Sequence, residues 1–224
     1  ITDGTWAYQR DNYGYRNLRS FPLLVSFGGL PYVDVRASFN SFIPNNLSAT
    51  LKDKLVNAYI EILSENPQLH DKIEFEVVFT IWMPSFFNIA KLRLGKYNIN
   101  EDEIYELENS LKYITKKALK RLENDISSVT LLEDRREKIL NSSLSFLDKA
   151  LMLLDDCKSF GTLAFSHAAR AGFIASTFIN SFVNNKYLSI KRKNEFLMSF
   201  KTVAGNFEKD KELFSLGELT LEGL

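Results

Sequence analysis

The feature that most constrains this sequence is a long apolar segment, residues 160–183, which carries one histidine and one arginine near its middle. An arginine at the centre of a bilayer costs about 2.5–3.5 kcal/mol on insertion scales, so a membrane-spanning helix is disfavoured. A helix that is apolar on almost every side is instead typical of the centre of a helical protein. We therefore expect residues 161–185 to form a central helix that is packed on several sides.

Further helices are predicted from apolar residues at helical spacing. Ser48, Asn100 and Ser189 are favoured N-cap residues, and Glu103 completes a capping box with Asn100. A short helix is expected over 86–94. One stripe, over 132–154, is assigned to a single long helix, and the last stripe is expected to face inward. The four stripes are Leu51, Leu55, Ala58, Tyr59 and Ile62; Ile104, Leu107, Leu111, Ile114, Ala118 and Leu122; Leu132, Ile139, Leu140, Leu144, Leu147, Leu151 and Leu154; and Phe196, Phe200, Val203 and Phe207.

Alternating apolar and polar residues predict a small antiparallel sheet in the first half of the chain. Strands are expected over 22–27 and 32–38, joined by a turn that contains Gly28 and Gly29. A third strand is expected over 70–80, and it makes the sheet plausible because a two-stranded ribbon alone is marginal. The predicted fold class is mainly α with a small antiparallel β-sheet: a helical bundle packed on a β-hairpin plus a third strand.

The domain organisation is predicted from a shift in composition near residues 80–100, where strand-like patterns end. We expect a strand-containing subdomain over 1–99 and a helical subdomain over 100–224. The last residues read as the start of another amphipathic segment, with Thr220 as a suitable N-cap. Because an initiating methionine is also missing, we expect a piece of a longer polypeptide.

Charge and cysteine content argue against several functions. Lys plus Arg and Asp plus Glu both number 28, whereas nucleic-acid binding needs a basic surface. Cys157 is the only cysteine and there are two histidines, so neither a disulfide nor a zinc site is expected. Cys157 is expected to pack as a small apolar side chain. Residues 1–20 carry no signal-peptide pattern. We expect a soluble cytoplasmic protein that binds neither nucleic acid nor membrane.

Catalytic signatures are missing from the sequence. The Gly28–Gly29 pair lacks the following helix and lysine of a phosphate-binding loop, and no G-x-S-x-G elbow is present. We therefore assign no catalytic residue, no metal ligand and no cofactor to this chain.

Two polar groups remain as candidate binding residues. On the expected strand 32–38, Asp34 and Arg36 share a face, with Asn40 nearby, and the planar fork of the arginine suits an anion. The alternative is a structural network in which Asp34 holds Arg36 and Asn40 caps a turn.

The second group is His167 and Arg170, which are neighbours on one face of the central helix. Burying them unpaired would be costly, so they must be satisfied either by an acidic side chain or carbonyl of a neighbouring element, or by a substrate or a mobile partner domain. Our hypothesis is one substrate-binding cluster of Arg36, Asn40, His167 and Arg170, in which the two arginines clamp an anion.

Four strings carry a family resemblance: PYVDVRASFNSFIP (31–44), HDKIEFEVVF (70–79), FGTLAFSHAARAGFI (160–174) and FKTVAG (200–205). Together they resemble the middle region of phosphoenolpyruvate synthase and pyruvate, phosphate dikinase-like proteins, whose layout is similar to that of rifampin phosphotransferase. The resemblance implies an ATP-grasp-like domain that splits ATP with Mg²⁺, a mobile domain with a phosphohistidine, and a further domain for the acceptor. The family's phosphohistidine lies in a Thr- and Gly-rich loop, which neither His70 nor His167 has.

The function that this resemblance implies is that of an internal helical domain of an ATP-dependent phosphotransferase. It would bind the acceptor substrate or dock the mobile phosphohistidine domain of the same polypeptide, and alone it would be inactive. One alternative is a non-catalytic scaffolding domain that spaces the catalytic modules. Another is an antibiotic- or polyketide-binding pocket, consistent with 18 Phe and 9 Tyr, although aromatic residues more often form a core.

Overall fold

The computed structural model describes residues 5–218, except for the side chains of residues 204, 208, 209 and 212. It is 71% helical, and the described part of the chain contains one two-stranded antiparallel sheet. The predicted fold class, mainly α with a small sheet, is therefore confirmed. The further helix start expected at Thr220 lies outside the described residues.

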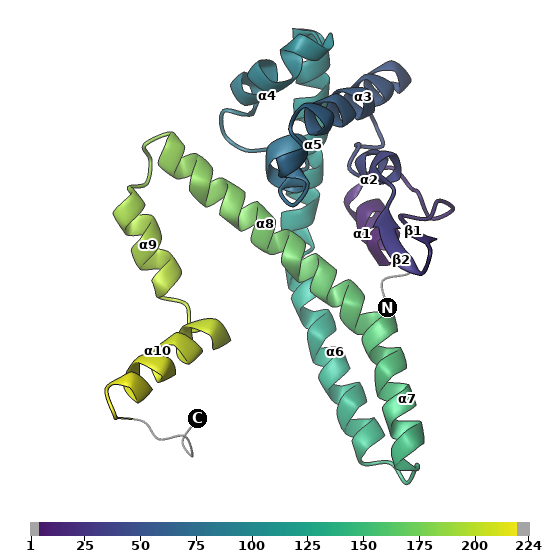
Figure 1. Ribbon diagram of the computed structural model, residues 1–224, viewed down its shortest axis with the longest axis vertical. Coiled ribbons are helices and arrows are strands. Elements are labelled where there is room, and N and C mark those ends of the chain that lie inside the picture. Colours follow the sequence, from purple (N-terminus) through teal and green to yellow (C-terminus); the bar gives the residue numbers. More distant parts are fainter. Residues whose placement is uncertain (1–4, 219–224) are drawn as a thin grey trace. The chain divides into compact units, whose positions relative to one another are not determined.

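The chain forms two compact units, Ile1–Phe178 and Ile179–Leu224, whose boundary falls within helix α8 (Figure 1). The elements, in chain order, are α1 (Thr5–Tyr13), β1 (Leu24–Phe27), β2 (Leu30–Val33), α2 (Val35–Ser41), α3 (Ala49–Glu65), a 3₁₀ turn (Pro67–Leu69), a π turn (Ile73–Val77), α4 (Phe86–Leu94), a 3₁₀ turn (Gly95–Tyr97), α5 (Glu101–Lys120), α6 (Leu122–Leu140), α7 (Phe146–Asp156), a π turn (Cys157–Gly161), α8 (Thr162–Asn184), α9 (Ile190–Met198) and α10 (Val203–Ser215). The boundary between the units therefore falls at residue 178 and not at residue 99, where it was expected. Helix α5 belongs to the first unit because it packs on α1 and α4.

The predicted helix starts are confirmed where a capping side chain is present. The Ser48 hydroxyl accepts a hydrogen bond from the backbone of Leu51, and Ser189 caps α9 in the same way. Asn100 and Glu103 form a complete capping box at the start of α5, with both hydrogen bonds 2.9 Å long. These side chains satisfy backbone N–H groups that the first helical turn leaves without partners.

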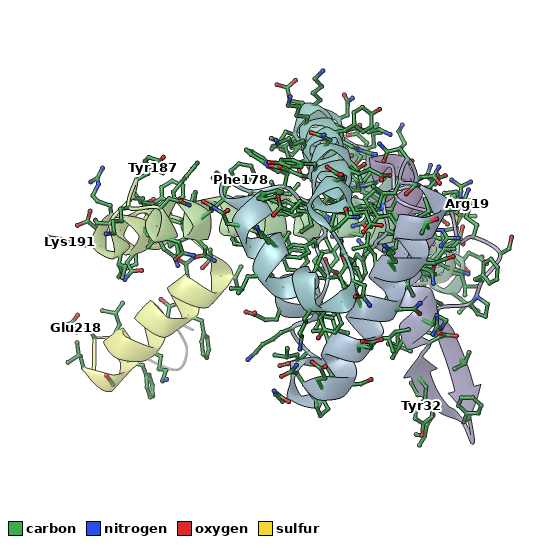
Figure 2. All side chains as sticks on the ribbon, turned by 90° about the horizontal axis from the view of Figure 1, so that it is seen from above. Arg19, Tyr32, Phe178, Tyr187, Lys191 and Glu218 are labelled. Carbon is green, nitrogen blue, oxygen red and sulfur yellow. The ribbon has the colours of Figure 1, made fainter. Side chains whose placement is uncertain are left out.

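The hairpin is present, but its second strand is shorter than predicted. Strands β1 and β2 pair antiparallel, with Phe27 opposite Leu30, across two glycines that both adopt positive φ. Figure 2 shows this ribbon with Tyr32 labelled near its exposed end. The strand expected over 32–38 ends at Val33, because the Asp34 carboxylate accepts a hydrogen bond from the backbone of Ala37 and starts α2. The expected strand face of Asp34 and Arg36 therefore does not exist.

The third strand expected over 70–80 is wrong. Residues Ile73–Val77 form a π turn, closed by a 2.9 Å hydrogen bond from the Val78 backbone N–H to the Ile73 carbonyl. The turn buries Val77 in the core and directs Glu74 toward two arginines. Tertiary contacts of these side chains thus override the alternating pattern.

The single helix expected over 132–154 is also wrong. It is two helices, α6 and α7, which lie side by side as an antiparallel pair (Figure 1). The break falls at residues 141–145, where Ser145 caps α7 by accepting a hydrogen bond from the backbone of Asp148. Short polar residues in this stretch favour a turn over a continued helix.

The core of the first unit lies among α2, α3, α4, α5 and the segment around Phe79. Its first two predicted stripes are confirmed, apart from Leu122, which begins α6 and is half-buried. The large buried residues include Tyr13, Tyr15, Phe39, Ile43, Leu51, Leu55, Tyr59, Val77, Phe79, Phe86, Leu94, Ile104, Leu107, Leu111, Ile114 and Ile174.

Helix α8 is present where predicted, but it is not buried on all sides. Within the first unit one face is buried, with Ala164, His167, Arg170 and Ile174 at helical spacing, whereas Phe165 is 74% exposed. None of the helices in the described part of the chain combines the length and hydropathy that crossing a bilayer requires.

The second unit contains the end of α8 together with α9 and α10. Lys186, with a positive φ, turns the chain after α8, and Lys193 donates a 2.7 Å hydrogen bond to Asn180. The helix expected to run on through residue 207 ends at Met198, and its stripe does not face inward. Phe196, Phe200, Val203 and Phe207 are all exposed.

Candidate functional site

Arg36 and Asn40 lie one turn apart on the surface helix α2. The Arg36 guanidinium donates a long, 3.4 Å hydrogen bond to the side chain of Asn57. The Asn40 amide donates to the Arg36 carbonyl at 2.9 Å, and its oxygen accepts from Arg16. These contacts make a local surface network on α2.

Arg170 lies elsewhere, buried at 2% exposure, and its guanidinium is occupied by groups of the protein. One terminal nitrogen bonds Glu74 at 2.8 Å, and the other bonds the Thr80 carbonyl at 2.8 Å and the Tyr15 hydroxyl. Arg170 therefore ties α8 to the segments around Tyr15 and Thr80. Its donors point into the protein and leave little capacity for an anionic ligand.

Glu74 also pairs with Arg10, at 3.4 Å, so one carboxylate is shared by the buried Arg170 and the partly buried Arg10. Burial lowers the pKa of Arg10 to about 10, which still leaves it charged at neutral pH. The Arg10 guanidinium packs over the ring of Phe42 at 4.0 Å, in a favourable cation–π arrangement.

His167 belongs to a second polar network with Tyr13, Arg121 and Asp125. Its Nε2 lies 3.3 Å from an Arg121 nitrogen and its Nδ1 lies 3.2 Å from the Tyr13 hydroxyl. Because arginine can only donate, Nε2 accepts, and the proton of the neutral ring is on Nδ1, which donates to Tyr13. Burial lowers the pKa of His167 and thereby favours this neutral form, although Asp125, 3.9 Å away, acts in the opposite direction.

Arg121 is held rigidly by Asp125. Its Nε lies 3.2 Å from both carboxylate oxygens, and its Nη2 lies 3.0 Å from Oδ1. A similar fork joins Arg135 to Asp156, with Nε 2.8 Å from Oδ2, and the hydrogen bonds from Arg135 lower the pKa of Asp156. Two-point contacts of this kind fix the plane of each guanidinium.

Both arginines line a cavity of about 510 Å³ between α6 and the start of α8, here called the α6–α8 cavity. Its walls combine charged, amide and apolar side chains from α1, α6, the Cys157–Gly161 turn and α8. The lining residues are Asn12, Arg121, Asn124, Asp125, Ser128, Leu131, Leu132, Asp134, Arg135, Lys138, Phe160, Leu163, Ala164 and His167. The volume is within the range of about 300–1,000 Å³ that is typical of small-molecule sites.

A second cavity, of about 250 Å³, lies further along α8 and is almost wholly apolar. Asp125 borders both cavities, whereas His167 and Arg121 border only the first. The second cavity is lined by Tyr13, Ala118, Leu119, Leu122, Asp125, Ala171, Ile174, Ala175 and Phe178.

The structure does not bring the four predicted residues together. No hydrogen bond or ion pair within residues 5–218 joins Arg36 or Asn40 to His167 or Arg170, and only His167 lines the α6–α8 cavity. The proposed cluster relied on a strand that is in fact helix α2.

Three cavity-lining residues, Arg121, Arg135 and Lys138, were not predicted from the sequence as binding residues. Arg121 and Asp125 were visible only as an ordinary i,i+4 pair, which resembles a solvated ion pair.

Cys157 is exposed and carries a free thiol, so the expectation that it packs as an apolar side chain is wrong. Among residues 5–218, no group of three His, Cys, Asp or Glu side chains is arranged to hold a metal ion.

Comparisons with known protein families, curated proteins and solved structures find no match to this chain.

Proposed function

We propose that this chain is the acceptor-binding part of an ATP-dependent phosphotransferase similar to the phosphoenolpyruvate synthases, and that the acceptor binds in the α6–α8 cavity. The observation that carries the proposal is that the resembling string 160–174 supplies one wall of this cavity. Phe160, Leu163, Ala164 and His167 all belong to that string and all line the cavity.

The role of this chain would be to bind and orient the acceptor. An ATP-grasp-like domain with ATP and Mg²⁺, and a mobile phosphohistidine domain of the same polypeptide, would supply the phosphoryl group. Such a division suits phosphoryl transfer, in which positioning and charge neutralisation provide most of the rate enhancement. Dependence on ATP also favours a cytoplasmic location.

Arg36, Asn40 and Arg170 have no part in this proposal as acceptor ligands. Arg170 stabilises the wall that α8 provides, through its hydrogen bonds to Glu74 and the Thr80 carbonyl. His167 remains a candidate acceptor-contacting residue because it borders the cavity.

Ligand-induced thermal stabilisation of the 224-residue chain tests the proposal. The panel is phosphoenolpyruvate, pyruvate, inorganic phosphate and straight-chain alcohols. A ligand that binds only the folded state raises the melting temperature, and the rise grows with the ratio of its free concentration to its dissociation constant. We expect at least one member to do so.

A matched pair of variants locates the binding. Leu131 and Ile126 both lie on α6 with side chains 63% and 62% exposed, but only Leu131 lines the cavity. Leu131→Trp should abolish the ligand-induced shift, and Ile126→Trp should leave it unchanged. If both variants keep the shift, the ligand binds elsewhere and the proposal fails.

The second candidate is a scaffolding domain, favoured by an apolar face on α7. Leu147, Leu151 and Leu154 lie at i, i+4 and i+7 and are 70%, 56% and 64% exposed. Exposed apolar stripes of this kind are typical of surfaces that bind another protein. A chain that binds no panel member, but whose Leu151→Glu variant fails to assemble with the catalytic modules, would be a scaffold.

A further inference from the structure

We propose that the ligand of the α6–α8 cavity is an amphipathic organic anion, with an apolar body and a carboxylate or phosphate head held by Arg121, Arg135 and Lys138. This inference rests on the proposed function, because it concerns the same cavity. It adds the chemical class of the ligand.

The charges that line the cavity favour an anion. Three cations line it, against two carboxylates, Asp125 and Asp134. Asp125 already accepts three contacts from Arg121, so it offers little to a cationic ligand. The carboxylate that holds Arg135, Asp156, is buried and does not line the cavity.

Unused hydrogen-bond donors point to the same conclusion. Arg121 and Arg135 each bond their acidic partner through Nε and Nη2, and neither Nη1 makes a hydrogen bond within residues 5–218. Lys138, one turn after Arg135 on α6, makes no ion pair in the same range and is exposed. Guanidinium and ammonium groups are donors only, so a ligand must bring the acceptors.

The two arginines are also preorganised. The Arg135 guanidinium lies 4.6 Å from the centre of the Phe160 ring and is fixed by Asp156, while Arg121 is fixed by Asp125 and His167. Side chains that are already ordered lose little entropy when a ligand binds.

The rest of the lining favours a ligand with an apolar body. Leu131, Leu132, Phe160 and Leu163 supply apolar surface, and the volume of about 510 Å³ is far larger than a bare phosphate ion needs. Covering this surface with an apolar group removes it from water, which favours binding. An anionic head alone would leave most of the cavity unfilled.

The test uses four ligands that share a ten-carbon chain and differ in the head: decanoate, decyl phosphate, decanol and decyltrimethylammonium. Affinities for the whole chain are measured by isothermal titration calorimetry below micelle-forming concentrations. At least one anion should bind about tenfold or more tightly than decanol, since hydrogen bonds to charged groups are worth more than neutral ones. The cation should bind no better than decanol. The ratio of the affinities for decanoate and decyl phosphate shows whether the cavity prefers a carboxylate or a phosphate head.

Charge-removing variants assign the effect to the cavity. Lys138→Met should weaken binding of the preferred anion about fivefold or more and leave decanol binding unchanged. Lys116→Met, an exposed lysine on α5 that does not line the cavity, is the matched control and should change neither affinity.

The outcomes separate this inference from the proposed function. Equal affinities for decanoate, decyl phosphate and decanol, all lost in Leu131→Trp, would refute the anionic head but retain ligand binding in the cavity. An equal loss of anion affinity in Lys138→Met and Lys116→Met would also refute the anionic head. Anion binding that survives Leu131→Trp would overturn both proposals.

Discussion

Arg170→Ala should destabilise the first unit strongly. The substitution removes a guanidinium that is 2% exposed and leaves Glu74, the Tyr15 hydroxyl and the Thr80 carbonyl without this donor. Removing one partner of a buried ion pair costs about 3–5 kcal/mol. Glu74 is 25% exposed and keeps Arg10 as a partner, so we expect the lower end, about 3 kcal/mol.

Urea unfolding followed by tryptophan fluorescence measures this loss. Both tryptophans, Trp6 and Trp82, belong to the first unit, so the signal reports on that unit alone. Arg36→Ala is the control, because Arg36 is exposed and makes one long hydrogen bond, and it should change stability by less than about 0.5 kcal/mol. If Arg170→Ala costs less than about 1 kcal/mol, the buried network does not anchor α8.

Three further predictions follow from local structure. Asn100→Ala removes the capping box of α5 and should cost about 1 kcal/mol in the same unfolding assay; an unchanged midpoint would show that the cap contributes nothing. Burial lowers the pKa of His167 in the folded state, so this side chain binds a proton more readily in the unfolded chain. The free energy of unfolding should therefore be highest above about pH 6.5 and decline as the pH falls below that value. His167→Gln should flatten that decline, whereas the same change at exposed His70 should not. Cys157, exposed and free, should react with one equivalent of a thiol reagent in the native protein; reaction only after denaturation would contradict its placement.

The parts of the fold that local chemistry determines were predictable from the sequence. Ser48, Asn100 and Ser189 marked helix starts because their side chains accept backbone N–H groups wherever a helix begins. The Gly28–Gly29 pair marked the hairpin turn because both residues need positive φ there.

The errors occurred where tertiary contacts or overlooked caps decided the structure. Residues 73–77 alternate like a strand, but Glu74 must reach Arg10 and Arg170, and a π turn places it there. Two other errors had a visible signal: Asp34 caps α2 and Ser145 caps α7. Each is a favoured N-cap residue that the apolar pattern obscured.

The candidate site was less predictable than the fold, because it depends on which helices meet. The sequence indicated that His167 would be buried and paired, and this is confirmed by its contacts with Tyr13 and Arg121. It gave no indication that α7 runs back along α6, which brings Asp156 to Arg135, 21 positions away in the chain. Pairings of this kind follow from packing between helices.

Both proposals depend on a ligand binding between α6 and the start of α8. The most direct measurement is a titration of the isotope-labelled chain with decanoate, followed by amide chemical shifts in a transverse-relaxation-optimised spectrum. Binding in the α6–α8 cavity would give saturable shifts concentrated at residues 121–138 and 160–167. Shifts confined to α9 and α10, or to the exposed face of α7, would refute binding between α6 and α8.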